Sequence, residues 1–174
     1  MKKTLLSIVM LAAIFMISNI NTYAQGTVTA TANAEVMASL SVLELTQLNF
    51  GKFSPEASGG TVIVATDGVR TKTSTVALLG GTVNQATFQI SATPSSKVAL
   101  VLPTSTLINN ATSGKSMTVN SFTLSPSLSA GGDITMPASG TQTLNVGGTL
   151  NVGVFTSNPV GLYTGTYTIT FSYN

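Results

Sequence analysis

The sequence predicts an all-β fold, an antiparallel β-sandwich, and three observations support this prediction. No stretch beyond residue 24 shows the 3.6-residue period of an amphipathic helix. Short runs rich in Val, Thr, Leu and Ile recur instead, and Gly, Pro, Asn and Ser separate them. Apolar and polar residues alternate strictly near both ends of this part of the chain. Such alternation is typical of strands with one buried face.

The first 24 residues are expected to be a secretory signal peptide, not part of the fold. Lys2 and Lys3 precede an apolar run from Leu5 to Ile17, and small residues before position 25 allow cleavage after Ala24. The run is shorter than the roughly 20 residues of a membrane-spanning helix, and an uncleaved membrane anchor is the alternative. Residues 25–174 are then one domain, exported to the periplasm and onward to the cell surface or the medium.

Charge and composition exclude several classes of function. The chain has seven Lys or Arg and five Asp or Glu; two of the basic residues lie before position 25, so residues 25–174 have a net charge of 5 − 5 = 0. Without a basic cluster, no surface for nucleic acid is predicted. His and Cys are absent, which removes disulfides, the usual nucleophile–base pairs and the common metal ligands. We therefore expect no enzyme activity, catalytic residue, metal or cofactor.

Nine strands are predicted from the apolar alternations and the turn residues between them. They are expected near residues 27–45, 60–65, 74–80, 85–92, 97–102, 116–124, 141–146, 149–156 and 162–173. Gly147-Gly148 separates two of these segments. Two adjacent glycines tolerate the positive φ that a two-residue hairpin demands. A tight hairpin is therefore predicted at Gly147-Gly148.

The alternation that begins after Gly26 is much longer than the usual strand of 5–6 residues. Its apolar residues lie at even positions as far as Val42, and the first of them are Val28, Ala30, Ala32 and Ala34. One interpretation is a single long or bent first strand of a self-sufficient sandwich. The other is that residues 25–34 form a detachable donor strand, which completes the sheet of a neighbouring molecule.

The last residues form the second strict alternation. Tyr and other large apolar residues occupy one parity, Thr and Ser occupy the other, and Gly165 interrupts the pattern. The apolar positions are Tyr163, Tyr167, Ile169, Phe171 and Tyr173. Any sandwich strand with one buried face gives such a pattern. The sharper hypothesis is that this face is apolar because it borders a groove in which another strand docks.

This ending resembles that of chaperone–usher pilus subunits. The resemblance rests on the penultimate Tyr173, on the alternating residues before it and on Gly161, fourteenth from the end. In that family the last strand flanks an open groove, pairs first with a periplasmic chaperone and later with the amino-terminal extension of the next subunit. The resemblance implies that residues 163–173 form the strand that interacts with chaperone and subunit, that Gly161 marks the bend into it, and that an outer-membrane usher is a further partner.

Residues 25–174 as a whole resemble an uncharacterised bacterial family of exported β-sandwich proteins, a domain-of-unknown-function family. The segments that carry this resemblance are LNFGKF at 48–53, VGGTLNVG at 146–153 and GLYTGTYTITFSY at 161–173. Several relatives are regarded as fimbrial or surface-appendage subunits. The two resemblances together imply an immunoglobulin-like or pilin-like sandwich.

Two functions therefore remain open. The first is a structural subunit of a bacterial fimbria or pilus, built from copies of itself or related subunits by strand complementation. The alternative is a stand-alone binding module, an adhesin for a glycan or host ligand that does not polymerise. Many pilus subunits carry a disulfide that this chain lacks, and Ala side chains fill a groove less fully than bulky ones. Both departures weaken the case for strand exchange and leave a complete, self-contained sandwich open.

Overall fold

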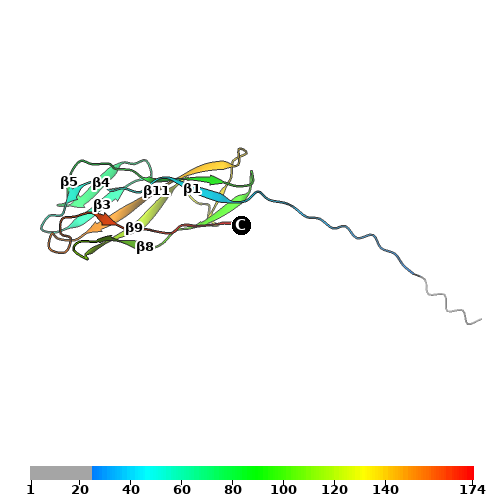
Figure 1. Cartoon of the computed structure of the whole chain (residues 1–174). Helices are drawn as coiled ribbons and strands as arrows, with labels where there is room; N and C mark the ends of the chain where they lie inside the picture. The colour runs from blue at the N-terminus through cyan, green and yellow to red at the C-terminus, as the bar shows by residue number, and fades with distance from the viewer. Residues whose placement is uncertain (1–24) are drawn as a thin grey trace, which may run out of the picture. The chain divides into compact units, whose positions relative to one another are not determined.

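The computed structural model describes residues 25–174 (Figure 1), and the predicted signal peptide lies outside the described residues. The chain divides after Glu35 into two units, the second of which is Val36–Asn174. Residues 25–35 contain no strand, and their side chains are exposed; Val28 is 91% exposed. No helix in the described range is long and apolar enough to cross a membrane.

Thirteen strands form the unit Val36–Asn174, and every pairing between them is antiparallel. The strands are β1 (Ser41–Thr46), β2 (Phe53–Ser54), β3 (Gly60–Val64), β4 (Arg70–Ser74), β5 (Ala77–Leu78), β6 (Ala86–Ser91), β7 (Lys97–Val101), β8 (Ser105–Asn110), β9 (Ser116–Ser125), β10 (Asp133–Thr135), β11 (Thr141–Val152), β12 (Tyr163–Thr164) and β13 (Thr170–Tyr173). The predicted all-β, antiparallel class is confirmed, and the arrangement is compatible with a β-sandwich.

The largest sheet has eight strands and is organised around β11. Its main order is β1-β6-β11-β9-β8-β12, while β3 pairs with β11 and β4 with β3. On one edge of β11, residues 141–146 pair with β6 and residues 148–152 pair with β3; the other edge pairs with β9. A second sheet has the order β10-β7-β13, and β2 and β5 form a third.

Two apolar clusters form the core. The first lies where β6 and β11 face β7 and β10, and its buried residues are Ala86, Ile90, Ala92, Val98, Leu100, Ile134, Met136, Leu144 and Val146. The second combines residues of β3, β9 and β11 with Phe50 and Val76, and its buried residues are Phe50, Val62, Val64, Val76, Met117, Val119, Leu150 and Val152. Burial of these side chains is the main force that stabilises the fold.

The predicted hairpin at Gly147-Gly148 is wrong, because β11 runs unbroken through both glycines. A Cβ on Gly147 would lie 2.5 Å from the carbonyl oxygen of Val64 and 2.7 Å from Thr123 Oγ1. The partner on one edge of β11 changes here from β6 to β3, and the register with β9 shifts between residues 147 and 149. The glycines therefore permit close packing of neighbouring strands, and they do not form a turn.

The interpretation of residues 27–45 as one long first strand is also wrong. Only Ser41–Thr46 pairs, with β6, and no described residue before Ser41 belongs to a strand. An alternating sequence becomes a strand only when a neighbouring strand accepts its main-chain hydrogen bonds. The predicted strand at 162–173 is likewise divided, into β12 and β13, and β2, β4, β8 and β10 were not predicted.

Candidate functional site

The carboxy-terminal segment passes from one sheet to another. β12 pairs with β8, through Tyr163 opposite Asn110, whereas β13 pairs with β7. Between them the chain lies close against β8: Thr106 Oγ1 donates to the carbonyl oxygen of Thr166 at 2.7 Å. A Cβ on Gly165 would collide with the carbonyl oxygen of Leu107. Gly165 thus interrupts the alternation because the main chain passes too near β8 for a side chain.

β1 and β13 are edge strands of two different sheets. β1 pairs only with β6, and β13 pairs only with β7. All six residues of β1 are exposed, including Val42, Leu43 and Leu45. Both faces of an apolar strand are therefore accessible to solvent, which is unusual unless something else covers one of them.

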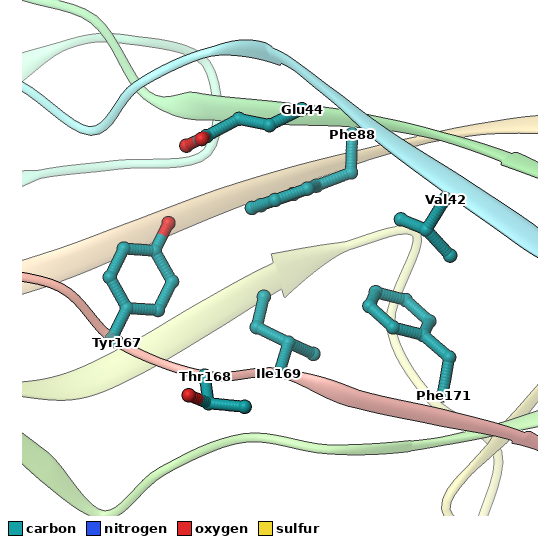
Figure 2. Close-up of a pocket in the computed structure, with 7 residues that line it drawn as sticks. All are labelled: Val42, Glu44, Phe88, Tyr167, Thr168, Ile169 and Phe171. Carbon is teal, nitrogen blue, oxygen red and sulfur yellow. The ribbon is translucent and has the colours of Figure 1, made fainter.

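A narrow cavity of about 290 Å³ lies between β1 and the last segment. Figure 2 shows Tyr167, Ile169 and Phe171 extending from the last segment toward Val42 and Phe88. Glu44 of β1 also lines the cavity, with its carboxylate on the side of the Tyr167 hydroxyl. The residues that line it are Val42, Glu44, Phe88, Tyr167, Thr168, Ile169 and Phe171.

A broader cavity of about 1120 Å³ continues from the narrow one, because Glu44, Phe88 and Tyr167 line both. It extends between the segment 47–55 and the segment 158–167. Its lining includes members of the second core cluster, namely Phe50, Met117, Val119 and Leu150. The two cavities thus form one open groove that is lined in part by buried core residues, and we call it the groove.

Tyr167 occupies the junction of the two cavities. Its ring packs against Phe122, with ring centres 5.2 Å apart. The hydroxyl is buried, and it has no hydrogen-bond partner among the described residues. Burial, and to a smaller extent the negative charge of Glu44, raises the pKa of Tyr167 to about 12. The middle of the groove therefore holds a polar group whose hydrogen-bonding capacity is unused.

Arg70 fixes the opposite wall of the broad cavity. Its Nη1 donates to the carbonyl oxygens of Phe50, at 2.9 Å, and Lys52, at 3.1 Å. Its Nη2 donates to the carbonyl oxygen of Leu79. One guanidinium thus connects the segment that carries Phe50 to the residue after β5, and it adds to the pairing of β2 with β5.

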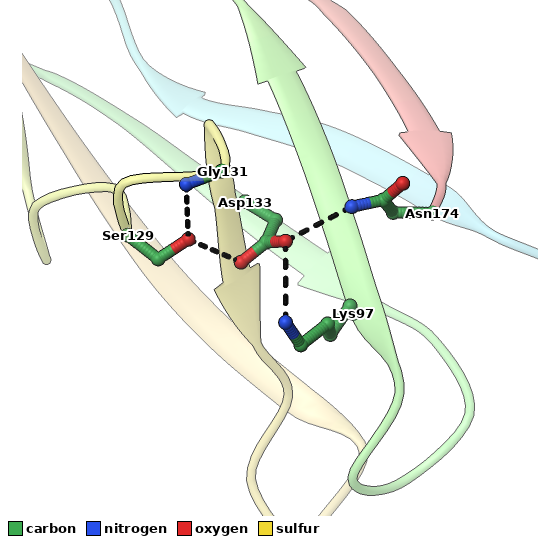
Figure 3. Close-up of polar contacts among 5 residues, drawn as sticks. All are labelled: Lys97, Ser129, Gly131, Asp133 and Asn174. Atoms are coloured by element: carbon green, nitrogen blue, oxygen red, sulfur yellow. Dashed lines mark hydrogen bonds and ion pairs between the residues drawn. The ribbon is translucent and has the colours of Figure 1, made fainter.

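A buried carboxylate anchors the end of the last strand (Figure 3). Asp133 is 2% exposed; its Oδ1 accepts from Ser129 Oγ at 2.5 Å, and its Oδ2 accepts from Asn174 Nδ2 at 3.0 Å. Lys97 Nζ lies 3.5 Å from the same Oδ2. These hydrogen bonds, and the charge of Lys97, hold the pKa of Asp133 below its usual value. This cluster fixes β13, and it takes no part in lining the groove.

The predicted site residues occupy three different surroundings. Tyr163, Tyr167, Ile169 and Phe171 line the groove, whereas Tyr173 packs on the first core cluster and lines neither cavity. Gly161 lies at a bend with φ +149°, where a Cβ would collide with the buried side chain of Asn110. The predicted donor-strand residues Val28, Ala30, Ala32 and Ala34 belong to the other unit and have exposed side chains.

The wall that faces the last segment was not predicted from the sequence. Val42 was identified only as part of a long alternation, and neither Glu44 nor Phe88 was predicted to line a groove. One signal in the sequence was available. Leu40, Val42 and Glu44 lie at alternate positions, which places a carboxylate on the apolar face of a strand. Within residues 25–174, no three acidic, His or Cys side chains gather closely enough to hold a metal ion.

A family model described as Domain of unknown function (DUF4402) matches residues 40–173. The chain belongs to this family. The matched range includes both walls of the groove, and it begins after the exposed segment 25–35. No curated protein matches the chain. The predicted membership of an uncharacterised domain family is thus confirmed.

Proposed function

We propose that this DUF4402 protein is a structural subunit of a bacterial surface appendage, fimbria- or pilus-like, whose copies are joined by strand complementation. The observation that carries the proposal is the groove between the unpaired edges of β1 and the last segment. A strand placed there adds main-chain hydrogen bonds to an open edge and covers apolar side chains of both core clusters. A periplasmic chaperone and an outer-membrane usher belong to the same proposal as assembly partners.

The proposed occupant is the segment Gln25–Glu35 of a second copy. Its residues form no strand of their own and are exposed, and their alternation suits a strand with one apolar face. Eleven residues in extended conformation span about 36 Å at ~3.3 Å per residue. The part of the groove wall from Leu162 to Phe171 has ten residues and spans about 33 Å on the same basis. The segment is therefore long enough to cover this part of the wall.

Cross-linking in the natural cysteine-free background tests this proposal directly. One chain carries Thr31→Cys in the segment, and a second carries Thr168→Cys in the groove. After mixing and mild oxidation, we expect disulfide-linked pairs of the two chains. The matched control replaces Lys72, an exposed residue of β4 that lines neither cavity, and Lys72→Cys is expected to give no pair with Thr31→Cys.

Two results would contradict polymerisation. Equal yields with Thr168→Cys and Lys72→Cys would show that the segment has no preference for the groove. A chain that carries both Thr31→Cys and Thr168→Cys tests insertion within one molecule. If that chain gives only internally linked monomers at every concentration, the sandwich completes itself and the polymer proposal fails.

A stand-alone binding module is the second candidate, and the size and lining of the broad cavity favour it. Its volume of about 1120 Å³, with Phe50, Phe53 and Tyr163 among its lining residues, is near the range of apolar ligand pockets. This function predicts a protein that remains monomeric at high concentration and binds its ligand without residues 25–35. Sedimentation of the chain Gln25–Asn174 over a wide range of concentrations separates the two candidates.

A further inference from the structure

The unpaired hydroxyl of Tyr167 lowers the stability of the free subunit. A buried hydroxyl without a partner loses its hydrogen bonds to water and gains none in return. A Phe at this position would keep the ring contact with Phe122 and avoid that cost. The other two tyrosines of the last segment have partners: Tyr163 donates to the carbonyl oxygen of Pro159, and Tyr173 donates to that of Ala38.

We propose that the docked strand supplies the missing partner: a main-chain group beside Ala30, Ala32 or Ala34 of a second copy hydrogen-bonds to the Tyr167 hydroxyl, which favours registers that place an alanine beside Tyr167. This inference rests on the proposed function and extends it. Tyr167 then acts as the specificity-determining residue of the groove, and its partner is the polar main chain of an alanine-rich strand.

The composition of the segment favours a main-chain partner. Its apolar parity offers only Val and Ala side chains, none of which can form a hydrogen bond. An Ala methyl group leaves the adjacent N–H and C=O accessible, whereas a branched side chain would cover them. Tyr167 sits among large side chains, namely Phe88, Ile169 and Phe171. Small residues on the docked strand and large residues on the wall are complementary in size at this point.

The main-chain contact restricts the register only in part. Main-chain groups repeat along a strand, so the contact does not distinguish Ala30, Ala32 and Ala34 from one another. It disfavours registers that place Val28 beside Tyr167, because the branched side chain of Val28 would cover the main chain there.

The test compares the chain Gln25–Asn174 with its Tyr167→Phe variant, using a labelled synthetic peptide of residues 25–37 as the probe. Both proteins are studied at concentrations low enough for the peptide to compete with their own segments. For Tyr167→Phe we expect peptide binding weaker by roughly threefold to tenfold, the value of one net hydrogen bond. We also expect the free subunit to be more stable, with a melting temperature about 2–6 °C higher.

Tyr163→Phe is the matched control, because Tyr163 also lines the groove but its hydroxyl already donates to Pro159 at 2.9 Å. That variant is expected to lower the stability of the free subunit and to leave peptide binding within about twofold. Opposite signs for the two Tyr→Phe changes would distinguish an unused hydroxyl from a structural one.

Peptides with Ala30→Leu, Ala32→Leu or Ala34→Leu locate the contact. We expect one of the three to bind the wild-type chain more weakly and to lose that penalty against Tyr167→Phe, as a coupled pair does in a double-mutant cycle. If the Leu and Phe effects are simply additive at all three positions, the claim that an alanine lies beside the Tyr167 hydroxyl is overturned.

The outcomes separate this inference from the function on which it rests. If the wild-type chain binds the peptide and Tyr167→Phe binds it equally well, the hydroxyl contact is overturned and strand docking stands. If the wild-type chain binds the native peptide no better than a scrambled peptide of the same composition, both the proposed function and this inference fail.

Discussion

The hydroxyl of Tyr173 donates a hydrogen bond to the carbonyl oxygen of Ala38, 2.7 Å away, although the two residues are 135 positions apart. The same hydroxyl accepts from the main-chain N–H of Thr93 at 2.9 Å, and Thr93 Oγ1 accepts from the N–H of Ala38 at 2.7 Å. Three segments of the domain meet at this point. The last strand therefore fixes the place where the chain enters β1, which is a different role from lining the groove.

Tyr173→Phe removes the hydrogen bonds of that hydroxyl to Ala38 and Thr93 and keeps the ring in the first core cluster. We expect a loss of about 1–2 kcal/mol in the free energy of unfolding, at 0.5–1.5 kcal/mol per net hydrogen bond. Amide exchange should accelerate at Ala38, whose N–H bonds to Thr93 Oγ1. Urea unfolding and hydrogen exchange measure the two effects.

Ser172→Ala is the control for this prediction, since Ser172 is an exposed residue of the same strand. It should change stability by less than about 0.5 kcal/mol. Equal effects of the two substitutions would show that the hydroxyl of Tyr173 does not hold Ala38.

Alternation predicted the terminal segment well because its pattern reflects local packing. Tyr163, Tyr167, Ile169, Phe171 and Tyr173 are all partly buried, and the Thr and Ser residues between them are exposed. The alternation does not show which other strands lie beside this segment. Neither the change of sheet at Gly165 nor the opposite wall formed by Val42 and Phe88 could be derived from it.

The error at Gly147-Gly148 has the same physical origin. Two adjacent glycines are compatible with a tight hairpin and equally with a continuous strand whose neighbours pack very closely. The local sequence does not show which neighbours are present. The spacing of the apolar residues argued against a hairpin. Leu144, Val146, Leu150 and Val152 all lie at even positions, as one continuous strand requires. All four side chains are buried in the core.

Gly147→Ala should be strongly destabilising, although Gly147 does not have a positive φ. The added methyl group would lie 2.5 Å from the carbonyl oxygen of Val64, so β3 and β11 must separate to admit it. We expect a loss of about 2–4 kcal/mol in the free energy of unfolding, measured in urea. Gly80→Ala is the matched control, because nothing lies within 4 Å of its added Cβ. A similar cost at both glycines would mean that crowding at the strand crossing is not the cause.

Asp133 should make the domain sensitive to acid. The hydrogen bond from Ser129, followed by that from Asn174, lowers the pKa of the folded-state carboxyl below the ordinary value of 3.8. The unfolded chain therefore binds a proton first as the pH falls. Stability from Asp133 is fully present above the ordinary pKa and is lost as the pH falls through the folded-state value.

Asp133→Asn should remove that part of the pH dependence and weaken the hold on Asn174. We expect the midpoint of urea unfolding to fall less between pH 6 and pH 3 in the variant than in the wild type. Asp67→Asn changes an exposed turn residue whose side chain accepts from the N–H of Val69, and it should retain the wild-type acid response. If Asp133→Asn responds to acid as steeply as the wild type, the cluster is not the source of the sensitivity.

Tyr167 should make the domain less stable at high pH, whereas Asp133 makes it less stable at low pH. Burial, with a smaller contribution from Glu44, raises its pKa from the ordinary value of 10.0 to about 12 in the folded state. The unfolded chain therefore loses this proton first as the pH rises. Stability from the neutral phenol is fully present below pH 10 and is lost as the pH rises toward 12. Tyr167→Phe should unfold less readily than the wild type in this interval, whereas Tyr163→Phe should keep the wild-type slope.

Absorbance titration of tyrosinate in the folded protein checks the assignment, because the late-titrating component should disappear in Tyr167→Phe and persist in Tyr163→Phe. A late component that survives Tyr167→Phe would place the buried phenol elsewhere and leave the middle of the groove without its unpaired hydroxyl.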